Sequence, residues 1–158
     1  MTVAVRDACP ADRPALAALI GAVAEFDAEE QAVALELVDD ALAARDDYRV
    51  LVAVANERVA GYACFGPTPM TRGTFDLYWI ATSIAARGAG VGGALIEGVV
   101  ARMRAEGGRL LRVETSSRSD YAATRRFYDR SGFAVAATIR DFYAPDDALV
   151  VYARYLGA

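Results

Sequence analysis

The stretch Thr74–Gly93, which reads TFDLYWIATSIAARGAGVGG, decides the fold of this chain. Residues 74–81 are rich in aromatic and other strand-favouring side chains and contain no turn residue, so they predict a strand. Apolar residues recur at helical spacing from Leu95 to Met103, which predicts a helix that continues to about Ala105. A glycine-rich junction before a helix presents free backbone N–H groups at the positive end of the helix dipole. Because glycine has no Cβ, a ligand can approach this backbone closely. The stretch therefore predicts a strand, a cradle for a pyrophosphate and a helix.

The composition predicts one globular domain. With 158 residues, 55% of them hydrophobic, the chain is expected to form a single domain over residues 1–158. A net charge of −4 gives no support to nucleic-acid binding. Residues 1–7 lack the features of a signal peptide and no apolar run is long enough to span a membrane, so we expect a cytoplasmic protein without membrane contact. Cys9 and Cys64 form no CxxC pattern, and Cys64 is expected to be a packed thiol.

Two absent residue types restrict the chemistry. The chain has no histidine and no lysine, because all 17 basic residues are arginine. These absences exclude Ser-His and Cys-His hydrolases, lysine Schiff-base enzymes and a Walker A loop. Without histidine or clustered cysteines a zinc site would rest on carboxylates alone, so we expect no metal.

The remaining segments predict a sheet around residues 74–105. Residues 48–55 and 58–65 predict an antiparallel hairpin, and residues 109–115 predict a strand parallel to the one before the helix. The fold class is therefore α/β, in part α+β, with a mixed, mostly antiparallel sheet of seven strands, about four helices and one parallel crossover. Three further strands are predicted at residues 3–6, 133–140 and 149–156. Three further helices are predicted: one that starts at Asp12, one from Glu29 to Ala44, and one from Ser119 or Asp120 to Arg130. In the helix from Glu29 to Ala44, the expected buried residues are Val33, Leu37, Val38 and Ala41.

The glycine loop allows a dinucleotide interpretation. Gly88 to Gly93 satisfy G-x-G-x-x-G, and Glu114 ends the next strand about twenty residues on, where an acid would bind a ribose hydroxyl. The first glycine of that fingerprint follows its strand almost directly, whereas residues 82–87 intervene here. Only one parallel crossover is readable in the chain. We therefore keep an NAD-binding module as the less favoured alternative.

The same residues also read as R-x-x-G-x-G, with Arg87, Gly90 and Gly92. Together with the strand before and the amphipathic helix after, this resembles the central motif of the GNAT superfamily of acetyl-CoA-dependent N-acetyltransferases. A second segment, Tyr121–Phe133, resembles a later motif of that family, a helix that ends in FY-x-x-x-GF. The order of elements agrees with the family over nearly the full chain.

The resemblance implies acetyl-CoA as cosubstrate and assigns its binding residues. Backbone N–H groups of the glycine loop would hold the pyrophosphate, and the preceding strand would bind the thioester through its backbone where it splays from the next strand. Thr82 and Ile84 stand where the family often has Val and Pro, and Tyr121 stands near its Asn. The implied cofactor-binding residues are Ala81, Thr82, Ile84, Arg87, Gly88, Ala89, Gly90, Val91, Gly92, Gly93 and Tyr121.

The resemblance also implies catalytic residues. Tyr128 would stand beside the sulfur and protonate the leaving thiolate, since a phenol is a competent donor at neutral pH. Asp76 and Glu114 are the two candidates for the general base, and either is alternatively a salt-bridge partner. Tyr143 either shapes the acceptor pocket or packs in the last turn. Acids at the second helix, among them Glu30, either suit the helix dipole or line a substrate pocket.

These expectations describe an N-acetyltransferase in which a primary amine attacks acetyl-CoA directly. The acceptor is a small-molecule or peptide amine, and the acidic net charge favours a cationic one. The resemblance allows a homodimer. A domain that binds acyl-CoA as a sensor without turnover is the alternative from another functional class.

Overall fold

The computed structural model describes residues 2–157 and contains one sheet of seven strands. Their spatial order is β1-β2-β3-β4-β5-β7-β6, and only β4 and β5 pair in parallel. This confirms the predicted fold class. The strands are β1 (Val3–Asp7), β2 (Arg49–Ala55), β3 (Arg58–Pro67), β4 (Thr74–Thr82), β5 (Leu110–Ser116), β6 (Ala134–Ala144) and β7 (Asp147–Tyr155).

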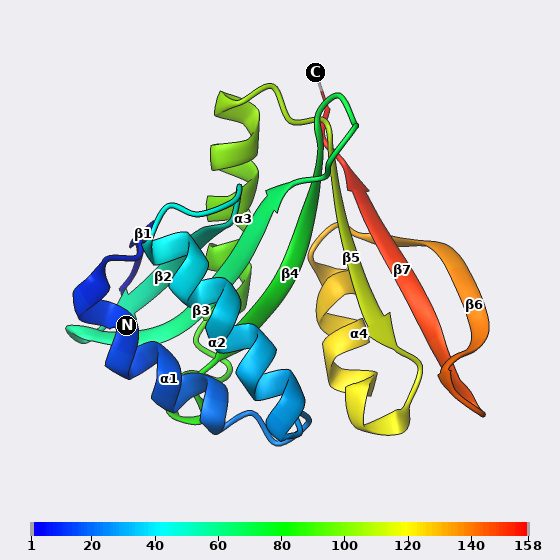
Figure 1. Ribbon diagram of the computed structural model, residues 1–158, viewed down its shortest axis with the longest axis horizontal. Helices are drawn as coiled ribbons and strands as arrows, with labels where there is room; N and C mark the ends of the chain where they lie inside the picture. Colours follow the sequence, from blue (N-terminus) through cyan, green and yellow to red (C-terminus); the bar gives the residue numbers. More distant parts are fainter. Residues whose placement is uncertain (1, 158) are drawn as a thin grey trace.

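Helices cover both faces of the sheet. In Figure 1, α1 and α2 lie across one face, and α3 and α4 lie on the other. None of the helices in the described part of the chain is long and apolar enough to cross a membrane. The helices are α1 (Arg13–Gly21), α2 (Ala28–Leu42), α3 (Val91–Ala105) and α4 (Ala122–Arg130), and the short 3-10 segments are η1 (Pro10–Asp12), η2 (Ile84–Ala86) and η3 (Ser119–Tyr121).

The strands divide their side chains between two cores. In β2, Leu51 and Ala53 pack under α3, whereas the alternate residues Val50 and Val52 pack under α1 and α2. This alternation is the period of two that a strand imposes on its side chains. Cys64 is buried in the second core as a free thiol, as predicted.

The helix α2 differs from its prediction in the residues that face the sheet. Val33 is 43% exposed, so its assignment to the buried stripe was wrong, and Ala34 is buried with Val38 instead. The small alanine side chain lets the helix lie close to the strands. The helix begins with a capping box in which Asp27 accepts a hydrogen bond from the N–H of Glu30 at 2.8 Å, and Glu30 accepts one from the N–H of Asp27 at 2.8 Å.

A β-bulge interrupts β4 at Tyr78. Cys64 of β3 pairs with Trp79, but the next residue, Phe65, pairs with Leu77, so Tyr78 is an extra residue on β4. As a result, Tyr78 and Trp79 both pack on the α1–α2 side, although neighbouring strand residues normally alternate.

Beyond the bulge, β4 separates from β5. The two strands pair only from Thr74 to Leu77 on β4 and from Leu110 to Val113 on β5. In Figure 1 they lie together at the top and diverge toward the bottom. The edge of β4 after Leu77 therefore has no strand partner on the β5 side, and its backbone groups there are free to bind a ligand.

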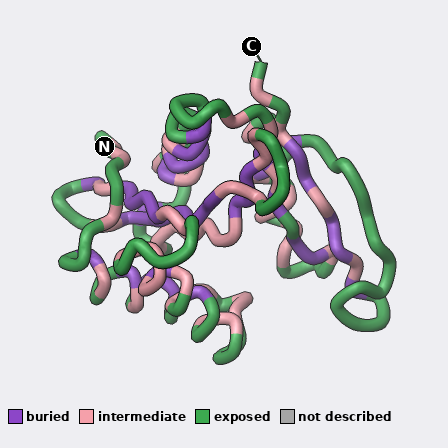
Figure 2. Tube along the Cα trace, turned by 45° about the horizontal axis from the view of Figure 1, so that its top comes forward, coloured by how far each residue is buried: buried purple, intermediate pink, exposed green. Residues whose placement is uncertain are grey.

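The edge strand β6 is longer than predicted and is exposed along its whole length. All of Ala134–Ala144 is solvent-exposed, and Figure 2 shows it as one continuous exposed segment at the side of the molecule. Its pairing with β7 jumps from Ile139 to Ala144, because residues 140–143 bulge out. Asp141 at this bulge has a φ of 55° and accepts a hydrogen bond from the N–H of Asp146 at 2.9 Å.

Tyr62 provides a test of the core. Its side chain is fully buried, and its hydroxyl has no hydrogen-bond partner among residues 2–157. Replacing Tyr62 by Phe removes an unsatisfied polar atom, so we expect the free energy of unfolding to rise by about 1 kcal/mol. Urea denaturation measures this change. Tyr155→Phe, at a position 77% exposed, is the control and should have no effect; a loss of stability in Tyr62→Phe would contradict the prediction.

Candidate active site

A cleft of about 1080 Å³ opens where β4 and β5 separate. Its walls come from both strands, the loop between β4 and α3, the helix α4, the connection between α1 and α2, and the β6–β7 hairpin. Because the cleft passes between two strands, it is reached from both faces of the sheet.

The glycine loop forms the end of the cleft next to α3. Gly88 and Gly90 both have a φ of 80°, and Gly90 is the N-cap of α3. Such backbone conformations favour glycine. A Cβ at either position would meet only open space. These glycines therefore serve the backbone conformation and the access to the loop, and no neighbouring side chain requires them.

The N–H groups of this loop are available to a ligand. Among residues 2–157, no acceptor forms a hydrogen bond with the N–H groups of Gly88, Gly90, Val91, Gly92 or Gly93. They lie at the start of a fifteen-residue helix, where the helix dipole is positive. A cluster of free donors with this dipole binds phosphate groups, so the loop fits the diphosphate of a nucleotide-containing ligand.

Gly92 has a second function in packing. A Cβ at Gly92 would lie 2.8 Å from Cε1 of Phe127 in α4, which is closer than Cβ atoms approach other atoms in proteins. The absence of a side chain at Gly92 therefore allows α4 to lie against the start of α3. Gly93, the next residue, has open space at the position of its Cβ.

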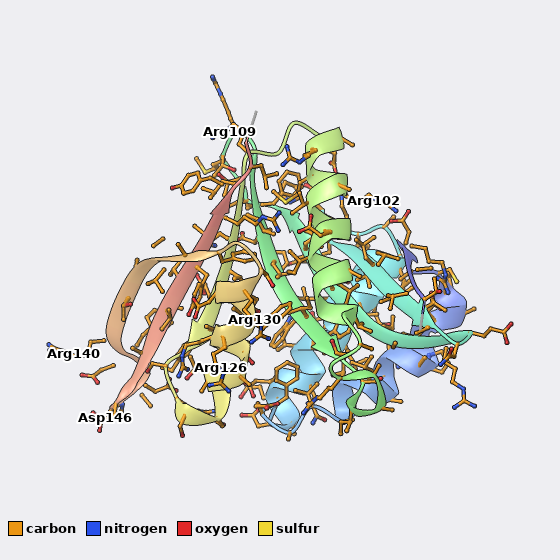
Figure 3. The ribbon with its side chains drawn as sticks, turned by 180° about the vertical axis from the view of Figure 1, so that it is seen from behind. Arg102, Arg109, Arg126, Arg130, Arg140 and Asp146 are labelled. Atoms are coloured by element: carbon orange, nitrogen blue, oxygen red, sulfur yellow. The ribbon has the colours of Figure 1, made fainter. Side chains whose placement is uncertain are left out.

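The arginines near the loop divide into two groups. Arg87 and Arg130 line the cleft, and Figure 3 shows Arg126 and Arg130 on α4, far from Arg102 and Arg109 at the other end of the molecule. By contrast, Arg125 donates hydrogen bonds at 2.7 Å to the backbone carbonyls of Ser116 and Arg118, so it holds the start of α4 against β5.

Tyr128 lines the cleft from α4 although its ring belongs to the core. It is 4% exposed, and its ring lies 5.5 Å from each of the rings of Phe127, Phe133 and Tyr152. No described residue accepts or donates a hydrogen bond at its hydroxyl. Burial, followed by the neighbouring Tyr121 and Tyr152, raises the pKa of Tyr128 above that of a free phenol. The Tyr128 phenol is therefore protonated at neutral pH, and its side chain lines the cleft.

The two acids predicted as bases lie on the same face of the sheet but in different surroundings. Asp76 is buried; its Oδ1 accepts a hydrogen bond from Nε of Arg112 at 2.7 Å, and its Oδ2 accepts one from Oγ1 of Thr68 at 2.8 Å. Glu114 is exposed and accepts one hydrogen bond from Arg112, at 3.0 Å on Oε1. Both oxygens of Asp76 are thus engaged, whereas Glu114 retains a free oxygen in the cleft.

The α1–α2 side of the cleft contains residues that the sequence analysis did not identify. Glu25 and Phe26 come from the connection between the two helices, and the ring of Phe26 meets that of Trp79 edge-on at 4.8 Å. The sequence analysis also missed Arg112. In β5 this residue alternates with the buried Leu111 and Val113, so the pattern indicates that it points to the opposite face of the sheet from them. Glu30 lines the cleft, as one of the two interpretations expected.

Two tyrosines that line the cleft have raised pKa values. Burial, followed by the charge of Glu30, raises the pKa of Tyr121 to about 12. Burial, followed by the charges of Glu114, Asp147 and Glu30, raises the pKa of Tyr143. Glu30, Tyr121 and Tyr143 all line the cleft.

Most of the predicted site residues meet in this cleft. Two do not line it: Ile84 is 66% exposed in η2, and Ala89 packs against the core. Within residues 2–157 no group of three or more cysteines and acids is arranged to hold a metal ion. The predicted residues that line the cleft are Asp76, Ala81, Thr82, Arg87, Gly88, Gly90, Val91, Gly92, Gly93, Glu114, Tyr121 and Tyr128.

Comparison with known proteins gives one consistent result. The model of the acetyltransferase (GNAT) family matches residues 17–133. A crystal structure from Desulfovibrio desulfuricans, assigned to the GNAT family of acetyltransferases, is 41% identical, with 99% of this chain and 100% of that chain covered and a TM-score of 0.92. None of the curated proteins matches the chain.

More distant structures share the fold. The ribosomal-protein-S18-alanine N-acetyltransferase of Escherichia coli is 18% identical, with a TM-score of 0.79 over 99% of this chain and 96% of that chain. The Salmonella typhimurium protein yncA, assigned as an acetyltransferase and determined with its cofactor acetyl-CoA, is 22% identical, with a TM-score of 0.72 over 100% of this chain and 96% of that chain.

The adjacent glycines of α3 give a matched pair of variants. We expect Gly92→Ala to lower the free energy of unfolding by about 1–3 kcal/mol, because the new methyl group displaces Phe127. Gly93→Ala has room for its methyl group and should leave stability unchanged or raise it by up to about 1 kcal/mol. Urea denaturation of the two variants measures the difference. Equal stabilities would show that Gly92 does not set the contact between α3 and α4.

Proposed function

The chain belongs to the GNAT family of acetyltransferases, and we propose that it transfers an acetyl group from acetyl-CoA to a primary amine by direct attack. The observation that carries this proposal is that the glycine loop, Tyr128 and Glu114 all line one cleft, which opens where β4 and β5 separate. Acetyl-CoA would supply an acyl group activated as a thioester.

The glycine loop supports the role of a diphosphate seat. Its free N–H groups, the helix dipole and the cleft-lining Arg87 and Arg130 together favour a negatively charged group at this end. The unpaired edge of β4 beyond Leu77 provides backbone groups for the arm and the carbonyl. A backbone N–H aimed at a carbonyl oxygen stabilises the negative charge that develops there during attack.

Glu114 is the better candidate for the general base. The amine must lose a proton before it attacks, and a base needs a free lone pair within the cleft. Glu114 has one, whereas Asp76 is held on both oxygens by Arg112 and Thr68. In this assignment Asp76 is a positioning residue that fixes Arg112, which in turn orients Glu114.

Tyr128 is the proposed general acid. Its raised pKa keeps the hydroxyl protonated at neutral pH, and the packing of its ring fixes the position of the hydroxyl oxygen. It would give its proton to the sulfur of the leaving thiol.

The cysteines support direct transfer rather than a covalent enzyme intermediate. Neither Cys9 nor Cys64 lines the cleft. Burial raises the pKa of Cys64 to about 12, so its thiol is not a nucleophile at neutral pH. The acetyl group would therefore pass to the amine in one step.

A binding experiment tests the donor before any acceptor is known. Acetyl-CoA should raise the melting temperature, since it binds the folded state, and NAD at the same concentration should not. Release of free thiol in the presence of an amine then reports turnover. Stabilisation by acetyl-CoA without thiol release for any amine would favour an acyl-CoA sensor, and stabilisation by NAD alone would overturn the assignment.

Replacing Tyr128 by Phe isolates its hydroxyl. We expect kcat to fall by about 100-fold while the dissociation constant of acetyl-CoA stays unchanged, because only the proton donor is lost. Steady-state kinetics and titration calorimetry measure the two quantities. Tyr152→Phe is the control, since Tyr152 lies in the same aromatic cluster but does not line the cleft. Full kcat in Tyr128→Phe would remove Tyr128 from the mechanism.

The two acids differ in what their amide variants should do to the pH profile. Glu114→Gln removes the ionisation of the base, so we expect kcat/KM to fall by about 100-fold or more and to lose its low-pH limb. Asp76→Asn should keep that limb but lose stability, because it leaves Arg112 without its buried partner. The opposite pattern of pH profiles would assign the base to Asp76.

A further inference from the structure

The charges that line the cleft are distributed unevenly. Arg87 lies in the glycine loop and Arg130 at the end of α4, where the donor is proposed to bind. The other side is acidic, and its two arginines are already paired: Arg112 with Asp76 and Glu114, and Arg118 with Asp120. Further acids on this side come from three separate segments, namely Glu25 before α2, Glu30 in its first turn and Asp147 at the start of β7.

Glu30, Glu114 and Tyr143 line the same cleft. The charges of both act on the hydroxyl of Tyr143, which the bulge of β6 brings to the cleft wall. Glu30 also acts on Tyr121, together with Glu25. The two carboxylates thus belong to walls of the cleft that come from different elements, α2 for Glu30 and β5 for Glu114.

A single amine does not balance these charges. The amine that attacks must give up its proton, so it does not remain a cation during the reaction. Glu30 uses Oε2 to accept the N–H of Asp27, which leaves Oε1 available, and no ion-pair partner of Glu25 lies among residues 2–157. Half-buried carboxylates without a cation are unfavourable, and a second positive group on the substrate would pair with them.

A second observation points to a ligand in the same cleft. Tyr128, which is 4% exposed, lines the same cleft, and no described residue forms a hydrogen bond with its hydroxyl. The aromatic pair of Phe26 and Trp79 lies next to Glu25 in the cleft wall and offers an apolar surface to an alkyl chain. The space therefore combines a reactive end, an apolar wall and two further acids.

We propose that the acceptor is a small aliphatic diamine or polyamine, bound with its reacting amine at Glu114 and a second ammonium group between Glu25 and Glu30. This rests on the proposed function of the same cleft as an acetyltransferase site. Glu25 and Glu30 are half-buried walls of the cleft and not part of an outer surface, so the second charge belongs to a molecule that enters the cleft whole. In this arrangement Glu30 determines specificity and takes no part in proton transfer.

The test compares two amines that differ in one charge. With saturating acetyl-CoA, kcat/KM for 1,4-diaminobutane should exceed that for butylamine by about tenfold or more, mainly through KM, because the additional ion pair forms on binding. Glu30→Gln should reduce this ratio to near one. A glutamine retains the capping box with Asp27, so the variant is expected to fold.

Glu29→Gln is the matched control. Glu29 precedes Glu30 on α2, is exposed and does not line the cleft, so this variant removes the same charge from the same helix turn. It should retain the full preference for the diamine. A melting temperature measured for each variant with and without acetyl-CoA confirms that the donor site is intact.

The outcomes separate this inference from the function on which it rests. Equal kcat/KM for the two amines, or equal effects of Glu29→Gln and Glu30→Gln, overturns the diamine assignment and leaves acetyl transfer standing. A peptide with an arginine beside its free amino group that exceeds every diamine in kcat/KM also overturns it. No transfer to any amine, with acetyl-CoA still bound, overturns the proposed function and this inference together.

Discussion

One additional residue in β4 determines where the site can form. Without the bulge at Tyr78, β4 would continue its parallel pairing with β5, and the sheet would close over the position of the cleft. The bulge turns the strand after four paired residues, and the backbone hydrogen bonds that β5 would have satisfied are left to a ligand. The bulge also puts the successive residues Tyr78 and Trp79 on the α1–α2 side of the sheet, where both form part of the cleft wall.

The cleft that results has opposite electrostatic character at its two ends. The end at α3 combines free N–H groups with arginines, and the end at α2 and β5 combines carboxylates with aromatic rings. A ligand with a diphosphate is favoured at the first end and disfavoured at the second, so its orientation follows from charge before any specific contact forms. The pair of Asp76 and Arg112 stands where the two strands separate, and Arg112 also holds Glu114, which keeps a free oxygen.

The sequence predicted the features that arise from local pattern. The apolar period of the helices, the strand preceding the glycines and the two motifs that resemble the GNAT family identified the fold and placed Tyr128 and the glycine loop at one site. The bulge could not be predicted, because an extra aromatic residue in the run from Phe75 to Trp79 fits a regular strand equally well. Glu25 and Phe26 were missed because they lie in a connection whose position depends on how two helices pack. Val33 was misassigned because α2 carries apolar residues on more than one side, and the packing distance favoured Ala34.

The contact between Gly92 and Phe127 has a consequence for how the protein recognises its donor. Phe127 is the chain neighbour of Tyr128, so the ring that rests on the glycine also fixes the backbone that carries the phenol. The seat for the diphosphate and the phenol therefore belong to one rigid unit with a set separation. If acetyl-CoA binds as proposed, this unit would set the distance between the diphosphate and the sulfur, and a thioester with a shorter pantetheine arm would not bring its sulfur to the phenol.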